Sequence, residues 1–306
     1  MKRTGLVFLG FLMAVACVAA DLSRFDAEAD VRKDLLARGV SLGSDATGSE
    51  YTVVASAESP FAGGNSSAAC AVRAGGFRIA ELRARHQIMN ARGMTVTGGT
   101  SARRGKDEDP KAKMVATMLE TFARRTLLGC EIVACREGTC KGRYVVALAL
   151  RWSRKLEEAE RASASGEIQP AADWRKTFQR VQESDGGRLL PPMGVFVDSQ
   201  GYVHHVGVGF SEPVSDDALA RSAAASHADL FARKNLQLSL YGDAEMRKVA
   251  AARLATGAFR STASVYEALG AVSASGPLPP GACSLVARSL VHPVTERTVY
   301  MVAWGF

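Results

Sequence analysis

The fold is decided by a stretch that occurs twice, first as Gly129-Cys130-Glu131-Ile132-Val133-Ala134, a polar turn, and Tyr144-Val145-Val146-Ala147-Leu148. The end of the chain repeats it as Ala282-Cys283-Ser284-Leu285-Val286-Ala287, a longer turn, and Tyr300-Met301-Val302-Ala303-Trp304. Runs of β-branched and aromatic residues on either side of polar turn residues are typical of a β-hairpin. The sequence therefore predicts two similar hairpins, each closing one copy of a repeated unit.

Each hairpin is preceded by a candidate strand that ends at a proline. Apolar residues alternate over 53–57 before Pro60 and over 206–210 before Pro213. Proline lacks the N–H that a sheet ladder needs, so it marks the end of a strand. The two prolines lie 153 residues apart, as do the first cysteines of the two hairpins. This common spacing indicates an internal duplication.

Between opening strand and hairpin, each copy carries apolar residues at helical spacing. The stripes are Ile79, Leu82, His86 and Met89 in the first copy, and Ala220, Ala224, His227 and Phe231 in the second. We further expect a short strand at 94–97 and at 236–240, and a second helix at 111–128 and at 244–269. The predicted fold is α+β, with two tandem β-α-β-α-β-β units, each a mixed sheet with helices on one face.

These patterns divide the chain into five segments. Helical stretches near 155–162 and 174–183 followed by glycine and proline pairs indicate a linker between the copies. The expected segments are a signal peptide at 1–20, an amphipathic helix at 21–50, the first repeat at 51–152, a helical linker at 153–201 and the second repeat at 202–306.

The N-terminus has the pattern of an export signal. Lys2 and Arg3 precede an apolar run over 5–16, which is too short to span a bilayer and suits the core of a secretory signal. Small side chains in Val18-Ala19-Ala20 favour cleavage before Asp21. The alternative is a degenerate lipoprotein signal in which Cys17 is acylated and anchors the chain. We expect a protein exported to the periplasm or outer cell envelope, with no membrane span after signal removal.

Composition argues for a globular protein without a nucleic-acid partner. Hydrophobic residues make up 47% and charged residues 23% of the chain, which is an ordinary globular balance rather than that of a disordered chain. The formal net charge is +7, but the basic residues are spread through the predicted helices. The single cluster at 103–106 is expected to be a solvated loop, because nucleic-acid binders gather basic residues with aromatics on one face.

The cysteines suggest one disulfide and no metal site. Cys135 and Cys140 flank a segment, 136–139, that we interpret as the hairpin turn, so they could face each other and form a disulfide, with free thiols as the alternative. Spacings of four residues between Cys130, Cys135 and Cys140 miss the usual zinc knuckle. Cys130 and Cys283 are expected to be small buried apolar residues.

Two histidines are the candidate ligand positions. His86 and His227 occupy matching places in the two predicted helices, so a ligand or proton site could exist in each copy. The alternative is a helix-face histidine that hydrogen-bonds a neighbour. His204 and His205 are adjacent in a strand and therefore point to opposite faces.

The sequence offers no catalytic or cofactor motif. It has no G-x-S-x-G, no S-x-x-K, no G-x4-G-K-[ST] and no H-E-x-x-H. We therefore expect no cofactor and no enzymatic activity.

An alanine-rich helix followed by a hairpin containing Tyr144-Val145-Val146-Ala147 resembles the small domains of bacterial envelope lipoproteins and of the flagellar assembly protein T. It is also similar to uncharacterised tandem-domain proteins exported by bacteria. The resemblance covers the two copies. It implies a non-catalytic envelope role and brings no catalytic residues.

Three functional hypotheses follow. The first is a non-catalytic cell-envelope protein that binds a protein or surface polymer through exposed sheet edges or the groove between the copies. The second is a small-ligand or glycan-binding periplasmic protein, with a pocket rimmed by aromatics such as Trp152, Trp174 or Trp304. The third is an enzyme of unrecognised type, which would need polar side chains converging in one cleft.

Overall fold

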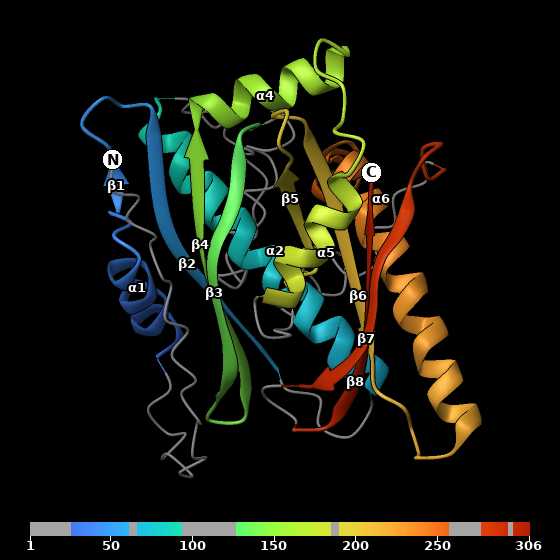
Figure 1. Ribbon diagram of the computed structural model, residues 1–306. Helices are drawn as coiled ribbons and strands as arrows, with labels where there is room; N and C mark the ends of the chain where they lie inside the picture. The colour runs from blue at the N-terminus through green and yellow to red at the C-terminus, as the bar shows by residue number, and fades with distance from the viewer. Residues whose placement is uncertain (1–25, 61–65, 94–126, 185–189, 257–276, 293–295) are drawn as a thin grey trace, which may run out of the picture.

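The computed structural model describes residues 26–60, 66–93, 127–184, 190–256, 277–292 and 296–306. Within them the chain forms two four-stranded antiparallel sheets, one in each half, with helices packed on them (Figure 1). The two sheets have the same strand order, β1-β2-β4-β3 and β5-β6-β8-β7. The tandem α+β prediction is thereby confirmed.

The first sheet is covered by a helix on each face. Val53, Ala55 and Ala57 face α2, whereas Val54 and its neighbours on β4 face α1. This alternation is what a strand buried on both faces requires. The elements are α1 (Ala27–Ala37), β1 (Gly43–Ser44), β2 (Glu50–Pro60), α2 (Ser66–Ala91), β3 (Cys130–Cys140) and β4 (Arg143–Ser153).

The second sheet repeats this arrangement with α6 on one face and α5 on the other. Trp174 and Phe178 of α5 pack on Val206, Val208 and their neighbours. The predicted linker helices are present as α4 and α5, and α5 belongs to the core of the second half. The elements are α4 (Arg154–Ser165), α5 (Trp174–Ser184), β5 (Met193–Val197), β6 (Val203–Ser211), α6 (Ala218–Thr256), β7 (Cys283–Val291) and β8 (Thr298–Gly305).

The repeated unit differs in detail from the predicted one. Each described unit runs β-β-α-β-β, its strands are antiparallel rather than mixed, and helices cover both faces of each sheet. The predicted strand at 236–240 is wrong, because these residues continue α6. Leu236 extends the buried four-residue stripe of Ala224, Ala228 and Ala232, so the helical period prevails over local β propensity. The predicted strand at 94–97 lies outside the described residues.

Two glycines let α6 lie directly on β6. A Cβ atom at Gly209 would be 2.1 Å from the carbonyl oxygen of Ala228, and one at Gly207 would be 2.0 Å from the backbone nitrogen of Leu236. Side chains at these positions would push the helix off the sheet. The alanine stripe of α6 and the two glycines therefore form one closely packed helix–strand contact.

Strand pairing corrects the alignment of the two copies. Val53 pairs with Leu150 on the α2 side of the first sheet, and Gly207 pairs with Trp304 on the α6 side of the second. Equivalent positions in these strands are therefore 154 residues apart, one more than the prolines suggested. Side chains alternate between the two faces of a strand. An error of one residue in the alignment of the two copies therefore assigns each side chain to the wrong face.

The cysteines show the consequence of this shift. Cys130 packs in the α2 core, whereas Cys283 packs against the α5 core of the second half. Cys135 and Cys140 are free thiols on one strand, because β3 continues to Cys140 and the turn is at Lys141 and Gly142. Five residues of strand separate their Cα atoms by about 16 Å, well beyond the reach of a disulfide. The predicted hairpin disulfide is wrong.

A buried arginine of the first half, paired with a glutamate of the same half, also contacts the second half. Arg73 of α2 is 1% exposed and donates to Glu137 of β3 through Nε at 2.7 Å and Nη2 at 2.9 Å. Its Nη2 also donates to the Leu190 carbonyl oxygen at 3.0 Å, and its guanidinium lies 4.7 Å from the ring centre of Phe77 and 4.4 Å from that of Phe210. Arg73 therefore connects the first sheet to residues of the second half.

Candidate functional site

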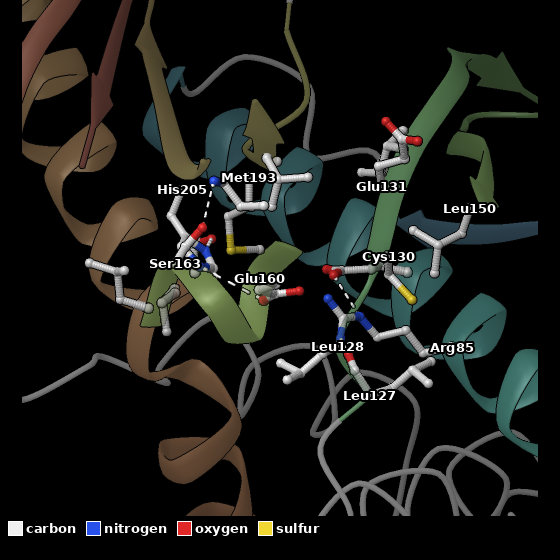
Figure 2. A pocket seen from close by; sticks show the side chains of 18 of the residues that line it. Arg85, Leu127, Leu128, Cys130, Glu131, Leu150, Glu160, Ser163, Met193 and His205 are labelled. Carbon is white, nitrogen blue, oxygen red and sulfur yellow. Dashed lines mark hydrogen bonds and ion pairs between the residues drawn. The ribbon is translucent and has the colours of Figure 1, made fainter. Parts of the chain in front are cut away.

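A cavity of about 540 Å³ lies between the two halves. Its walls come from α2, β3, α4, β5, β6 and α6 (Figure 2). A second cavity of about 180 Å³ adjoins it and shares Ile132, Met193, Gly194 and Val195 with it. The two cavities follow the neighbouring edges of the two sheets, and we call them together the inter-repeat groove.

The α2 wall of the groove carries three charged residues. Arg78, Glu81 and Arg85 are spaced by three and four positions, so they share one face of α2. Glu81 accepts hydrogen bonds from Arg78 Nη1 and Arg85 Nε, both at 3.0 Å. Burial alone would raise the pKa of Glu81, but the two guanidinium groups outweigh it and lower that pKa. Glu81 therefore forms ion pairs with both arginines and fixes their positions on this wall.

The opposite wall is formed by α4, β6 and α6. Glu160 accepts a hydrogen bond from the Gly129 backbone N–H at 2.8 Å and lies 3.9 Å from Nε2 of His205. The other ring nitrogen of His205, Nδ1, is 3.0 Å from the Ser239 hydroxyl. Figure 2 shows Glu160, Ser163 and His205 across the groove from Arg85 and Cys130. Charged side chains therefore lie on both walls of the groove.

Both walls are fixed by the chain that leads into β3. Arg85 donates through Nη1 to the Leu127 carbonyl oxygen at 2.9 Å, and Glu160 binds the N–H of Gly129. Gly129 has a φ of +77° and a Cβ there would lie 2.7 Å from the backbone nitrogen of Glu157. A glycine is required here both for the left-handed backbone and for the close approach of α4.

The edge of β5 presents backbone groups to the groove. Val208 donates to the Pro192 carbonyl oxygen and Asp198 donates to that of Tyr202, so the even-numbered residues of this strand bond to β6. In an antiparallel pair the intervening residues point their N–H and C=O the other way. Met193 and Val195 therefore direct these groups away from β6, and both residues line the groove.

The edge of β3 faces the same groove. Ser153 donates to the Gly129 carbonyl oxygen, which places the N–H and C=O of Cys130 on the side away from β4. β3 and β5 lie next to each other but belong to different sheets. The groove is thus bordered by two strand edges whose backbone groups do not pair with one another.

The groove offers hydrogen bonds and charge rather than an activated nucleophile. Burial raises the pKa of the Cys130 thiol to about 12, so this thiol is protonated at neutral pH. Ser239 contacts His205, but it lies inside α6, where helical backbone N–H groups are already bonded to carbonyl oxygens. Acyl-transfer chemistry needs free donors beside the nucleophile. The arrangement therefore suits binding.

A second polar cluster lies on the α5 side of the second sheet. Nε2 of His204 is 3.1 Å from the Asp198 carboxylate, and its ring stacks on Trp174 with centroids 3.8 Å apart. Asp198 also accepts the backbone N–H groups of Ala171, Gln200 and Tyr202. These contacts order the β5–β6 turn and so position the β5 edge of the groove.

We predict that acidification destabilises the protein before its carboxylates titrate. Burial lowers the pKa of His86, His204 and His292, for His204 despite the opposing Asp198 charge. In the unfolded chain these rings take up protons at about pH 6.5. The contribution of these histidines to the free energy of unfolding is therefore complete above that pH, and it is lost as the pH falls below it.

Urea denaturation at about pH 7.5 and 5.5 measures this effect. The free energy of unfolding should be smaller at the lower pH, and His204→Gln should reduce the difference. An equal or larger free energy at the lower pH would contradict the prediction.

The histidines singled out from the sequence do not line the groove. His86 is half-buried on α2, with Nδ1 3.4 Å from the Asn90 amide nitrogen, whereas His227 is exposed on α6. Their surroundings differ, and their role as ligand positions stays a prediction. Cys17 lies outside the described residues.

The tryptophans proposed for a pocket rim also lie elsewhere. Trp152 donates through Nε1 to Glu157 at 3.0 Å, and Trp304 donates to Asp229 at 2.7 Å. Trp174 is buried against His204. Among the described residues, the aromatic side chains that line the groove are Tyr202 and Phe306 in the larger cavity and Phe178 in the smaller one.

Sequence reasoning missed the charged residues of the groove. The available signal was the spacing of Arg78, Glu81 and Arg85 on the helical face that flanks an apolar stripe. Within the described part of the chain, no cluster of three or more His, Cys, Asp or Glu residues could hold a metal ion. In the same part of the chain, every helix is too short or too polar to cross a bilayer.

Comparison with known proteins identifies a similar fold. No protein-family model and no curated protein matches the sequence. The crystal structure of a hypothetical protein from Francisella tularensis matches with a TM-score of 0.51 and 15% identity. The match covers 91% of this chain and 87% of that one. At this identity the similarity shows a shared two-sheet fold and nothing about activity.

Proposed function

We propose that this chain is an exported, non-catalytic cell-envelope protein that binds another protein or a surface polymer in the inter-repeat groove. The sequence pattern of residues 1–20, which predicts an export signal, supports the location. The groove supports binding, and its extent carries the proposal: two cavities that share Ile132 and 193–195 in their linings follow the neighbouring edges of the two sheets. A site of this extent, bordered by two strand edges, fits an extended chain better than a compact ligand.

A small periplasmic ligand is the second candidate. The larger cavity, at about 540 Å³, has the size of a typical small-molecule site. Its apolar floor, which includes Leu127 and Leu150, and its few charged groups fit that class as well. This candidate predicts that a ligand fills the larger cavity and leaves the smaller one empty.

Site-specific photo-crosslinking distinguishes these functions. A benzophenone amino acid replaces Met193 in the groove or, as a matched control, Val214, which is 88% exposed and outside both cavities. Each variant is irradiated in envelope extract and examined by mass spectrometry. A macromolecular adduct at position 193 and none at 214 supports the proposal. Equal adducts at both positions, or none at 193, would contradict it.

A further inference from the structure

The smaller cavity of the inter-repeat groove combines an apolar lining with one buried amide. Its volume is about 180 Å³, and Gln182 is the polar side chain in a lining that otherwise consists of apolar residues and Gly194. Gln182 is 8% exposed, and its Oε1 is buried without a hydrogen-bond partner among the described residues. A buried acceptor is normally hydrogen-bonded, because it has given up its bonds to water. The amide therefore points to a ligand that supplies the missing bond.

The cavity occupies the space that a side chain at position 194 would fill. Gly194 pairs with Val206 of β6, so both positions lie on the face of the sheet that α5 covers. A Cβ atom at Gly194 would meet no atom within 4 Å. Across this space, Phe178 and Gln182 lie four positions apart on α5, and both line the cavity. The missing side chain of Gly194 thus leaves room beside the Gln182 amide.

The end of α5 that carries Gln182 is tied to β7. The Gln182 backbone carbonyl oxygen accepts a hydrogen bond from Arg288 Nη1 at 3.3 Å. One turn earlier, Gln179 Nε2 donates to the Leu285 carbonyl oxygen at 2.7 Å. The backbone that presents the amide is therefore held in place before a ligand arrives, which lowers the entropic cost of binding.

Size and polarity together select the ligand. An apolar cavity of about 150 Å³ is large enough for one benzene ring. A phenol hydroxyl can donate to an amide oxygen or accept from an amide nitrogen, whereas an indole N–H can only donate. The smaller cavity also shares Ile132 and 193–195 with the larger one, so a chain that lies in the groove can insert one side chain into it.

We infer that the smaller cavity binds the phenol ring of a tyrosine in the partner protein, with the tyrosine hydroxyl hydrogen-bonded to the Gln182 amide. This inference rests on the proposed function and specifies its partner as a protein. Tyrosine is enriched in protein interfaces, where its ring fills apolar pockets and its hydroxyl finds a polar partner.

Two small probes test the recognition by NMR titration of the protein. 4-Methylphenol corresponds to the tyrosine side chain, and toluene is the same ring without the hydroxyl. The methyl signals of Val206 and Val208 report occupancy, because both residues line the cavity. 4-Methylphenol should bind with a dissociation constant on the order of 1 mM. Absence of binding at about 10 mM would overturn the inference.

Gln182→Leu tests the role of the amide. The variant replaces a buried group that lacks a partner with an apolar one, so its melting temperature should be equal or higher. The preference for 4-methylphenol over toluene, measured as the ratio of their dissociation constants, should fall about tenfold. The matched control Gln200→Leu, at an exposed position outside both cavities, should leave this ratio unchanged. An unchanged ratio in Gln182→Leu would also overturn the inference.

Gly194→Val tests the place of binding. Valine suits a strand, and its side chain would occupy the cavity, so both probes should bind at least about tenfold more weakly without a loss of stability. Gly194→Ala should change the affinity in the same direction by a smaller factor. Undiminished binding of both probes to Gly194→Val would place their site elsewhere and contradict the inference.

Two peptides distinguish a protein partner from a free phenol. The acetylated and amidated pentapeptide Ala-Ala-Tyr-Ala-Ala should bind more tightly than 4-methylphenol, because its backbone adds contacts in the groove. The same peptide with phenylalanine should bind about tenfold more weakly than the tyrosine peptide. If 4-methylphenol binds and the tyrosine peptide does not, the ligand is a free phenol and the assignment to a partner protein fails.

The crosslinking experiment fails separately from these titrations. A crosslink at position 193 without binding of 4-methylphenol would retain the groove as a binding site and exclude the tyrosine. Binding of 4-methylphenol without a crosslink would retain the phenol site and contradict the proposed function. If neither occurs, both proposals fail.

Discussion

Gly209→Ala is expected to destabilise the second half by more than about 3 kcal/mol. The new Cβ would lie 2.1 Å from the Ala228 carbonyl oxygen and 2.3 Å from the Ala232 backbone nitrogen. Both atoms belong to the backbone of α6, so no side-chain rotation relieves the clash. The helix would have to leave the sheet and lose its buried alanine stripe.

The matched control is Gly194→Ala in β5 of the same sheet. A Cβ at Gly194 meets no atom within 4 Å, so its effect should stay within about 1 kcal/mol. Urea denaturation followed by circular dichroism gives both values. Equal free energies of unfolding for the two variants would show that α6 does not lie against β6 as described.

Arg73→Leu is expected to cost about 3–5 kcal/mol, because it leaves the Glu137 carboxylate buried without its partner. Burial would raise the pKa of Glu137, but the Arg73 charge and hydrogen bonds, with a further bond from Tyr144, hold that pKa below its ordinary value. Arg73 also contacts Leu190 and Phe210, so its loss weakens the junction between the halves.

Two comparisons separate this effect from a general loss of charge. Arg143→Leu breaks an ion pair with Glu58 whose side chains are 57% and 52% exposed, and it should cost less than about 1 kcal/mol. The double variant with Glu137→Leu removes both buried charges and should be more stable than Arg73→Leu alone. Similar losses for Arg73→Leu and Arg143→Leu would contradict the buried pairing.

The sequence was sufficient to predict the elements with strong periodicity. Alternation over 53–57 and 206–210 predicted β2 and β6, and the stripe of Ala220, Ala224, His227 and Phe231 predicted the first part of α6. Prediction from the sequence failed where the local conformational preference of a segment competes with its long-range packing. Leu236 has β-forming neighbours but continues a helical stripe, and β5 is a five-residue strand directly after two prolines.

Register was the main source of error, because the sequence pattern does not show which residues of two strands pair. Cys130 and Cys283 align by eye at a spacing of 153, yet the sheets place them in cores on opposite faces. Cys135 and Cys140 looked like partners across a turn that in fact lies after Cys140. The sequence therefore shows that a repeat exists, but it does not show how the residues of the two copies align.

The groove was beyond sequence reasoning for a different reason. Its charged and edge residues come from α2, β3, α4, β5 and β6, which are far apart in the chain. Each residue alone has an ordinary interpretation: Arg78, Glu81 and Arg85 form helix ion pairs, and Glu160 is one of several charges on α4. Their convergence depends on how the two halves pack.

The central claim is that the inter-repeat groove, which the outer edge of β5 borders, is the site where a partner binds. Amide hydrogen exchange measured by NMR at each residue of β5 tests it most directly. In the free protein the N–H groups of Met193 and Val195 should exchange faster than that of Gly194, which bonds to β6. Adding the partner captured by crosslinking at position 193 should slow the exchange of the Met193 and Val195 N–H groups and leave that of Val197, which lies outside both cavities, unchanged. Slow exchange at Val195 in the free protein, or no change when that partner is added, would contradict the claim.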